Sequence, residues 1–335
     1  MFAYAVRRVF WMIVVIFGVM TIAFFISRVI PADPVGAILG PQAPPEAVEK
    51  AKQRWGLDKP VFIQYTVFLG RLFRGDLGTS IRTRQPVLED MKKFMPATIE
   101  LTLLALLIGV GLGLPLGIIS AVRNGKIADH LARLFAITGL SMPAFWTGIL
   151  LLFVFYYTLN WLPGPGQLPM FMQRPPRVTG FITLDSLIAG NFAAFWSALR
   201  HMILPAFTLG WLSTAAITRI SRSSMLDVMR EDYIQTARMK GLNENRVIFK
   251  HALKNAFIPT ITVIGLRIAS LLEGAVLTET VFSWPGLGRY STHAFLAIDF
   301  PAVVGAAMLF AFLYSFSNLI VDLIYGFLDP RIRYS

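Results

Sequence analysis

Six apolar segments limit the fold of this chain more than any other feature of its sequence. They cover residues 9–30, 98–121, 134–159, 203–220, 260–282 and 302–325. Each is long enough to cross a lipid bilayer as a helix, which takes about 20 residues. The bilayer offers no partner to an unpaired backbone group, and no segment alternates as barrel strands do. We therefore predict an all-α membrane protein with six transmembrane helices, and the hydrophobic content of 55% agrees.

Basic residues set the expected orientation. Arg7 and Arg8 precede the first segment, which is too long for a cleaved signal and lacks a small-residue cleavage site. Connections longer than about 60 residues have little influence on orientation, and residues 31–96 form one. When the basic residues of this long connection are left out of the count, 15 basic residues lie on the side of the termini and five on the opposite side. Both termini are therefore predicted to be cytoplasmic.

Two polar connections, residues 31–96 and 160–202, are predicted to lie on the side opposite the cytoplasm. The first contains a helical pattern at 46–54. It also contains an apolar helix at 62–73 that is too short to span and is expected to lie on the bilayer surface. We divide the chain into residues 1–97, the first helix with its excursion, and residues 98–335, a core of five transmembrane helices.

A third connection, residues 221–259, is the most polar run between two apolar segments. Tyr233, Ile234 and Ala237 give a narrow apolar face on a charged helix. Gly241 follows, where a left-handed residue commonly ends a helix, and Asn243 is placed to cap a second helix. A short helix held between two membrane segments is suited to fit a groove of another protein.

This connection resembles the cytoplasmic loop of the permease subunits of bacterial ABC importers. In the peptide and nickel branch of that family the loop reads approximately DYxxTAxxKGL, followed by HALxNxxxP. The matching residues are Asp232, Tyr233, Thr236, Ala237, Lys240, Gly241, Leu242, His251, Ala252, Leu253, Asn255 and Pro259. The general pattern of EAA, three residues and Gly is met only in part, because Gln235 and Thr236 precede Ala237.

Other motifs extend the resemblance over essentially the whole chain. They include PADP at 31–34, GLDKP at 56–60, and a turn with Trp284, Pro285, Gly286 and Gly288 that is expected on the periplasmic side. The length of residues 160–202 is most similar to dipeptide permeases. The resemblance implies the binding-protein-dependent transport fold. It assigns coupling to an ATPase to Tyr233, Thr236, Ala237, Arg238, Lys240, Gly241, Leu242 and His251.

The resemblance also implies partners at the bacterial inner membrane. A homologous second permease would complete the pathway, two cytoplasmic ATP-binding subunits would supply energy, and a periplasmic peptide-binding protein would deliver cargo for alternating access. Dipeptides or other short peptides are the expected cargo, with oligopeptides, glutathione, haem and nickel as alternatives. Outside this class, the alternatives are an intramembrane enzyme or a secondary transporter. A secondary transporter usually shows internal repeats, and no clear repeat is found.

The sequence contains no motif for binding ATP or a metal ion. It has no phosphate-binding loop of the Gly-x-x-x-x-Gly-Lys-Ser/Thr type, so ATP hydrolysis is expected in partner subunits. No cysteine is present, and the four histidines form no i, i+4 pair, so neither a metal site nor a cofactor is predicted. The net charge of +12 lies in connections around the apolar segments, which argues against nucleic acid as a partner.

A few side chains inside apolar segments are candidates for the substrate pathway. They are Ser141, Met142, Arg267, Ser270 and Glu273. A charge at the centre of a membrane helix costs roughly 2.5–3.5 kcal/mol on insertion scales and tends to face a cavity or a partner. Arg267 and Glu273 either pair with each other or line the path of a charged substrate. Pro143, next to Met142, is expected to bend the third segment.

Overall fold

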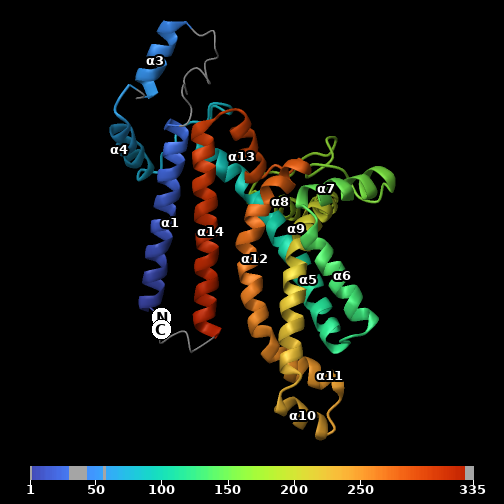
Figure 1. The fold of residues 1–335 in the computed structure, drawn as a ribbon. Coiled ribbons are helices and arrows are strands. Elements are labelled where there is room, and N and C mark those ends of the chain that lie inside the picture. The colour runs from blue at the N-terminus through green and yellow to red at the C-terminus, as the bar shows by residue number, and fades with distance from the viewer. Residues whose placement is uncertain (1, 30–43, 56–57, 329–335) are drawn as a thin grey trace.

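The computed structural model describes residues 2–29, 44–55 and 58–328 (Figure 1). This part of the chain is built from helices and contains no β-strand. The helices are α1 (Phe2–Val29), α3 (Pro45–Trp55), α4 (Val61–Leu72), α5 (Val87–Val122), α6 (Ile127–Ser141), α7 (Ala144–Leu151), the π-helical η1 (Leu152–Thr158), α8 (Ile182–Ile188), α9 (Phe192–Val228), α10 (Asp232–Met239), α11 (Glu244–Arg246), the π-helical η2 (Val247–Ala252), α12 (Leu253–Val281), α13 (Leu287–Leu296) and α14 (Phe300–Leu328). The PADP motif at 31–34 lies outside the described residues.

Five continuous helices in this part of the chain are long and apolar enough to cross a membrane, and a sixth candidate is bent. They lie in α1, in α5, in α9, in the continuous run of α11, η2 and α12, and in α14. The bent candidate consists of α6 and the following run of α7 and η1. The helix axis bends by 110° between these two parts. Proline has no N–H and pushes the preceding residue out of helical geometry, so Met142 is extended and the helix restarts after Pro143. The six predicted segments are thus confirmed as helical, the third as a bent pair.

Several helices extend beyond the apolar segments that predicted them. α5 begins at Val87, and α9 continues to Val228, past the end of its apolar run at residue 220. The expected division between residues 97 and 98 therefore falls inside α5. One continuous helix joins the region of the first excursion to the core.

The centre of the bundle is the α5–α9 pair. Gly109, Gly113 and Gly117 of α5 lie against Ser213, Ile217 and Ser221 of α9, respectively. A Cβ added to Gly117 would lie 2.6 Å from the Cβ of Ser221, a distance that real side chains do not adopt. Small residues allow two membrane helices to pack closely in this way. Gly111, on another face of α5, has open space beside it.

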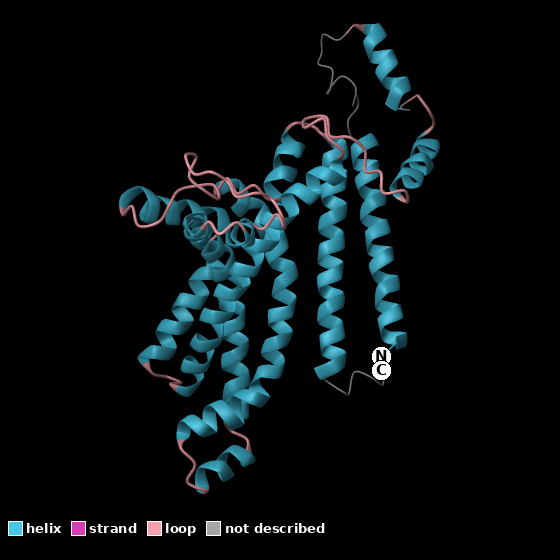
Figure 2. Cartoon of the chain, turned by 180° about the vertical axis from the view of Figure 1, so that it is seen from behind, coloured by secondary structure: helices cyan, strands magenta, loops and turns pink. Residues whose placement is uncertain are grey.

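α1 and α14 lie side by side at one edge of the bundle (Figures 1 and 2). Most large apolar side chains in the middle of α1 are exposed, as expected for a helix that faces lipid. α4 packs on α1: the Tyr65 hydroxyl lies 2.7 Å from Thr21 Oγ1, and the rings of Tyr65 and Phe68 lie 5.1 and 5.2 Å from that of Phe24. As predicted, α4 is too short to span.

The bundle has two different ends (Figures 1 and 2). α10 and α11 extend beyond the long helices at one end, on the side where α1 begins and α14 ends. α7, α8 and α13 lie toward the opposite end. We call these the α10 end and the α13 end.

Candidate functional site

A loop of short helices, residues 229–252, connects α9 to α12 at the α10 end. α10 ends at Met239, and Gly241 has a φ of +72°, the left-handed conformation predicted after a helix end. The side-chain oxygen of Asn243 accepts a hydrogen bond of 2.9 Å from the backbone N–H of Asn245 and caps α11. The predicted order of helix, break and helix is confirmed.

The apolar face of α10 points into the chain. Ile234 and Ala237 are 0% and 7% exposed. They pack in a cluster with side chains of α5, α9, η2 and α12, namely Ile118, Ala121, Met225, Val247, Ile248, Ala252 and Ala256. Ile234 and Ala237, two of the three residues of the predicted apolar face, are therefore engaged within the chain and do not form a free surface for a groove of another protein. This geometry makes Ala237 a packing residue that fixes α10 against α5 and α9.

The opposite face of α10 and the turn after it are exposed. This surface includes Thr236, Met239, Lys240 and Gly241, and it extends to Tyr233, which the sequence pattern had grouped with the apolar face. Met239 is 80% exposed, a large value for an apolar side chain beside a membrane domain. Arg238, Leu242 and His251 are half-buried. Arg238 donates to Glu244 at 2.8 Å, and this carboxylate raises the pKa of the Arg238 guanidinium.

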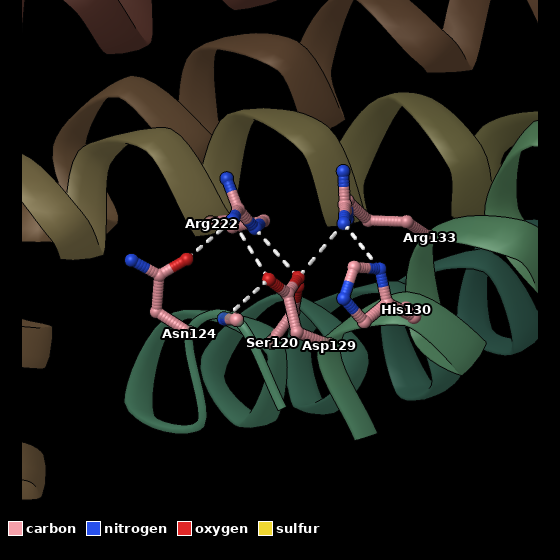
Figure 3. A network of polar contacts seen from close by, with 7 residues as sticks. Ser120, Asn124, Asp129, His130, Arg133 and Arg222 are labelled. Carbon is pink, nitrogen blue, oxygen red and sulfur yellow. Dashed lines mark hydrogen bonds and ion pairs between the residues drawn. The ribbon is translucent and has the colours of Figure 1, made fainter. Parts of the chain in front are cut away.

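Behind the loop, one buried carboxylate joins three helices (Figure 3). Asp129, near the start of α6, is 1% exposed. Its oxygens accept hydrogen bonds from Arg222 of α9 at 2.9 and 3.0 Å, from the Ser120 hydroxyl of α5 at 2.5 Å, and from the Gly125 N–H at 3.0 Å. Arg133 forms a further ion pair with it at 3.2 Å. We call these residues the Asp129 network.

The Asp129 network was not predicted from the sequence. The available signal was that Asp129 is the only acid among the basic residues between the second and third apolar segments. Its partner Arg222 lies six residues before the end of α9, just ahead of α10. The network therefore holds the α5–α6 connection to the part of α9 from which the 229–252 loop extends.

At the α13 end, the turn with Trp284, Pro285, Gly286 and Gly288 is largely buried. Trp284 is 0% exposed, and its indole N–H donates to the Ala97 carbonyl at 2.9 Å. The Leu287 N–H donates to the Thr98 hydroxyl oxygen at 2.8 Å. These contacts fix the turn on α5, so its motif residues are explained by packing within the chain.

Glu279 of α12 lies under this turn and is 0% exposed. It accepts hydrogen bonds from the Thr98 hydroxyl at 2.6 Å and from the Arg289 N–H at 3.1 Å. A side chain at Gly286 would collide with the Glu279 carboxylate, and one at Gly288 would collide with the backbone of α12. The glycines are therefore required by the carboxylate and helix that they cover.

The five predicted pathway residues lie on two segments. Ser141 is exposed and Met142 half-buried at the α6–α7 bend. Arg267 and Ser270 are half-buried on α12, and the Nε of Arg267 is enclosed without a hydrogen-bond partner. The side chain of Glu273 lies outside the described part of the structure, so the proposed Arg267–Glu273 pair is untested. Among the described residues, no three His, Asp or Glu side chains are grouped as metal ligands would be.

Two family models match nearly the whole chain. The model described as the inner membrane component of binding-protein-dependent transport systems matches residues 113–334. The model of the N-terminal part of such membrane components matches residues 1–102. The chain belongs to this permease family. Its fold and its inner-membrane, multi-pass character follow from this membership together with the apolar helices described above.

Curated relatives of the permease carry peptide-transport names. It is 48% identical over 326 residues to the probable D,D-dipeptide transport system permease protein DdpB of Escherichia coli (strain K12), covering 97% of this chain and 96% of that protein. It is 42% identical to the dipeptide transport system permease protein DppB of Alkalihalophilus pseudofirmus, over 100% of both chains. It is 36% identical to the oligopeptide transport system permease protein AppB of Bacillus subtilis (strain 168), again over 100% of both.

Proposed function

We propose that this permease is the transmembrane subunit of an ATP-driven importer for dipeptides or other short peptides. Support comes from the full-length similarity to dipeptide permeases at 42–48% identity. A homologous second permease, two cytoplasmic ATP-binding subunits and a periplasmic peptide-binding protein complete the proposed assembly. The α10 end faces the cytoplasm and the α13 end faces the periplasm. This is the orientation that the distribution of basic residues predicts.

The exposed face of α10 is the proposed contact with an ATP-binding subunit. The exposed residues of this face lie around Met239 and Gly241. The buried residues of the same helix pack against α5 and α9. A force on the exposed face would therefore act on both long helices. ATP-driven movement of the 229–252 loop would rock these helices and open the α13 end, from which the binding protein releases its cargo into the pathway.

The connections at the α13 end form the proposed docking surface for the binding protein. Met170 and Phe171, between η1 and α8, are fully exposed apolar side chains on this surface. Asp58 is exposed as well, whereas Asp185 is 3% exposed and accepts hydrogen bonds from Thr179 and Gly180. Labels that test the orientation should therefore replace Asp58 and Met170. Reaction of such cysteines only from the cytoplasmic side contradicts the proposed orientation.

Uptake of a radiolabelled dipeptide into proteoliposomes tests the function. The permease is purified with the subunits that co-purify with it, and the binding protein is supplied outside. We expect uptake that requires ATP inside the vesicles and that unlabelled dipeptide blocks. Competition by an oligopeptide, glutathione, haem or Ni²⁺ instead would reassign the cargo. Uptake driven by an ion gradient without ATP would identify a secondary transporter.

A further inference from the structure

An open hollow of about 410 Å³ lies beside the first turns of α9. One face of α9 forms one of its walls, with Trp196, Ser197, Arg200 and His201 at the spacing i, i+1, i+4 and i+5. The segment that follows η1 forms the other wall, and it contributes the apolar side chains of Leu162 and Pro163. The volume is that of a typical small-molecule site, in which apolar walls surround a few polar groups.

The polar groups of this hollow have hydrogen-bonding capacity that the chain leaves unused. Arg200 donates from Nη2 to the Trp161 carbonyl at 2.8 Å, and no carboxylate in the described part of the chain forms an ion pair with it. This contact orients the guanidinium and leaves its other N–H donors for a ligand. His201 is only 7% exposed, and its Nδ1 lies 2.7 Å from the Ser197 carbonyl oxygen.

The hydrogen bond of His201 determines which of its ring nitrogens can meet a ligand. A carbonyl oxygen can only accept, so Nδ1 carries the proton. In the neutral ring Nε2 is then an acceptor, and it has no partner among the described residues. The hollow therefore offers a cation with free donors at Arg200 and a single acceptor at His201.

The hollow lies where two apolar segments end. Residues 160–163 follow the apolar segment 134–159, and residues 196–201 lie just ahead of the apolar segment 203–220. The same two stretches carry exposed aromatic side chains, namely Tyr156, Tyr157, Trp161 and Trp196. Tyr and Trp are enriched at the boundary between membrane and water. Both observations place the hollow at the level of the lipid headgroups.

We propose that this hollow binds the headgroup of an anionic phospholipid, with Arg200 on the phosphate and His201 Nε2 accepting from a headgroup hydroxyl. Guanidinium groups bind phosphate through paired N–H donors, and basic pockets between membrane helices hold anionic headgroups. No described carboxylate lines the hollow, so the ammonium of phosphatidylethanolamine finds no counter-charge in it. Phosphatidylglycerol has a phosphate and hydroxyls but no ammonium, and it matches both polar groups.

Cysteine labelling in lipid nanodiscs tests the site on the permease with the subunits that co-purify with it. The chain has no cysteine, so Ser197→Cys places its single thiol in the hollow. N-ethylmaleimide labelling of this chain, read by mass spectrometry, should be slower in phosphatidylglycerol than in phosphatidylethanolamine, on the order of tenfold. Adding Arg200→Gln should remove this difference, and Arg200→Lys should keep part of it. Arg174→Gln removes an exposed arginine outside the hollow and, as the matched control, should keep all of it.

Native mass spectrometry gives a second measurement that needs no introduced cysteine. The wild-type permease should retain phosphatidylglycerol through detergent purification, and Arg200→Gln should lose it. Equal retention by the two proteins overturns the proposal. So does a change in labelling on Arg200→Gln that is the same in both lipids, because it shows that the arginine only fastens the segment of Trp161.

Competing anions identify the source of the bound group. Protection of the Ser197→Cys thiol by inorganic phosphate or by alanyl-alanine, in nanodiscs without phosphatidylglycerol, overturns the proposal in favour of a soluble anion. Phosphatidic acid carries the phosphate without the glycerol hydroxyls, so it should protect less than phosphatidylglycerol. Equal protection by these two lipids contradicts the contact assigned to His201.

Discussion

Two buried carboxylates fasten the two ends of the bundle, and their partners differ. At the α10 end, Asp129 is paired with the guanidinium groups of Arg222 and Arg133, besides accepting hydrogen bonds from the Ser120 hydroxyl and the Gly125 N–H. At the α13 end, Glu279 accepts from a hydroxyl and from backbone N–H groups under a turn of glycines. Side-chain ion pairs can separate and form again by rotamer changes, whereas backbone donors move only with the chain. The difference that remains is that ion pairs hold the Asp129 network, whereas neutral donors hold the Glu279 carboxylate.

Removal of the Asp129 carboxylate is expected to have the largest effect on stability. Asp129→Ala leaves Arg222 largely buried without its counter-charge and should lower the free energy of unfolding by about 3 kcal/mol. Denaturant unfolding of the purified permease in detergent measures this. Adding Arg222→Met should restore part of the loss, since it removes the more buried of the two guanidinium groups that the Asp129→Ala change leaves unpaired. If the double variant is less stable than Asp129→Ala, the ion pair is not the reason for the loss.

A methyl group at the α13 turn is expected to have the next largest effect. Gly286→Ala places a Cβ against the Glu279 carboxylate, and overpacking of this kind costs about 1–3 kcal/mol. Gly111→Ala is the matched control, because that position has open space in a helix. The control should be neutral or slightly stabilising. Equal stability of the two variants would show that the turn is able to rearrange.

Substitutions on the two faces of α10 should have different effects, one on the stability of the permease and the other on its coupling to the ATPase. Ala237→Arg forces a long charged side chain into the cluster against α5 and α9, so it should lower thermal stability. Met239→Arg changes an exposed position, where effects on stability are usually within about 0.5 kcal/mol. It should reduce peptide-stimulated ATPase activity of the assembled complex while the permease remains folded. If the Met239→Arg variant keeps full peptide-stimulated ATPase activity, the exposed face of α10 is not the contact with the ATPase.

The smallest effect is expected at the Arg238–Glu244 ion pair. The pair is partly exposed, with side chains 32% and 52% accessible. Glu244→Gln should therefore cost less than about 1 kcal/mol, and the difference should shrink as salt is added. A larger, salt-insensitive loss would mean that the loop is held by this contact rather than by its apolar face.

Local features were predictable from the sequence. Gly241, Asn243 and Pro143 each act through their own covalent structure or through a neighbour a few residues away. The residues that join distant parts of the chain were not predictable in this way. Asp129 and Arg222 are 93 positions apart, and Glu279 and Thr98 are 181 apart. The burial of Ile234 and Ala237 was not predictable for the same reason, because their partners lie on α5, α9, η2 and α12.

The glycine contacts between α5 and α9 also determine where the chain can change length. Each residue of an α-helix rotates the following ones by about 100°. One residue inserted in α9 between Ser213 and Ser221 would turn Arg222 away from Asp129 and rotate the whole 229–252 loop around the helix axis. The same insertion in the connection between η1 and α8 would alter only a surface segment. Length variation among homologous permeases should therefore collect in the outer connections and be absent from this stretch of α9.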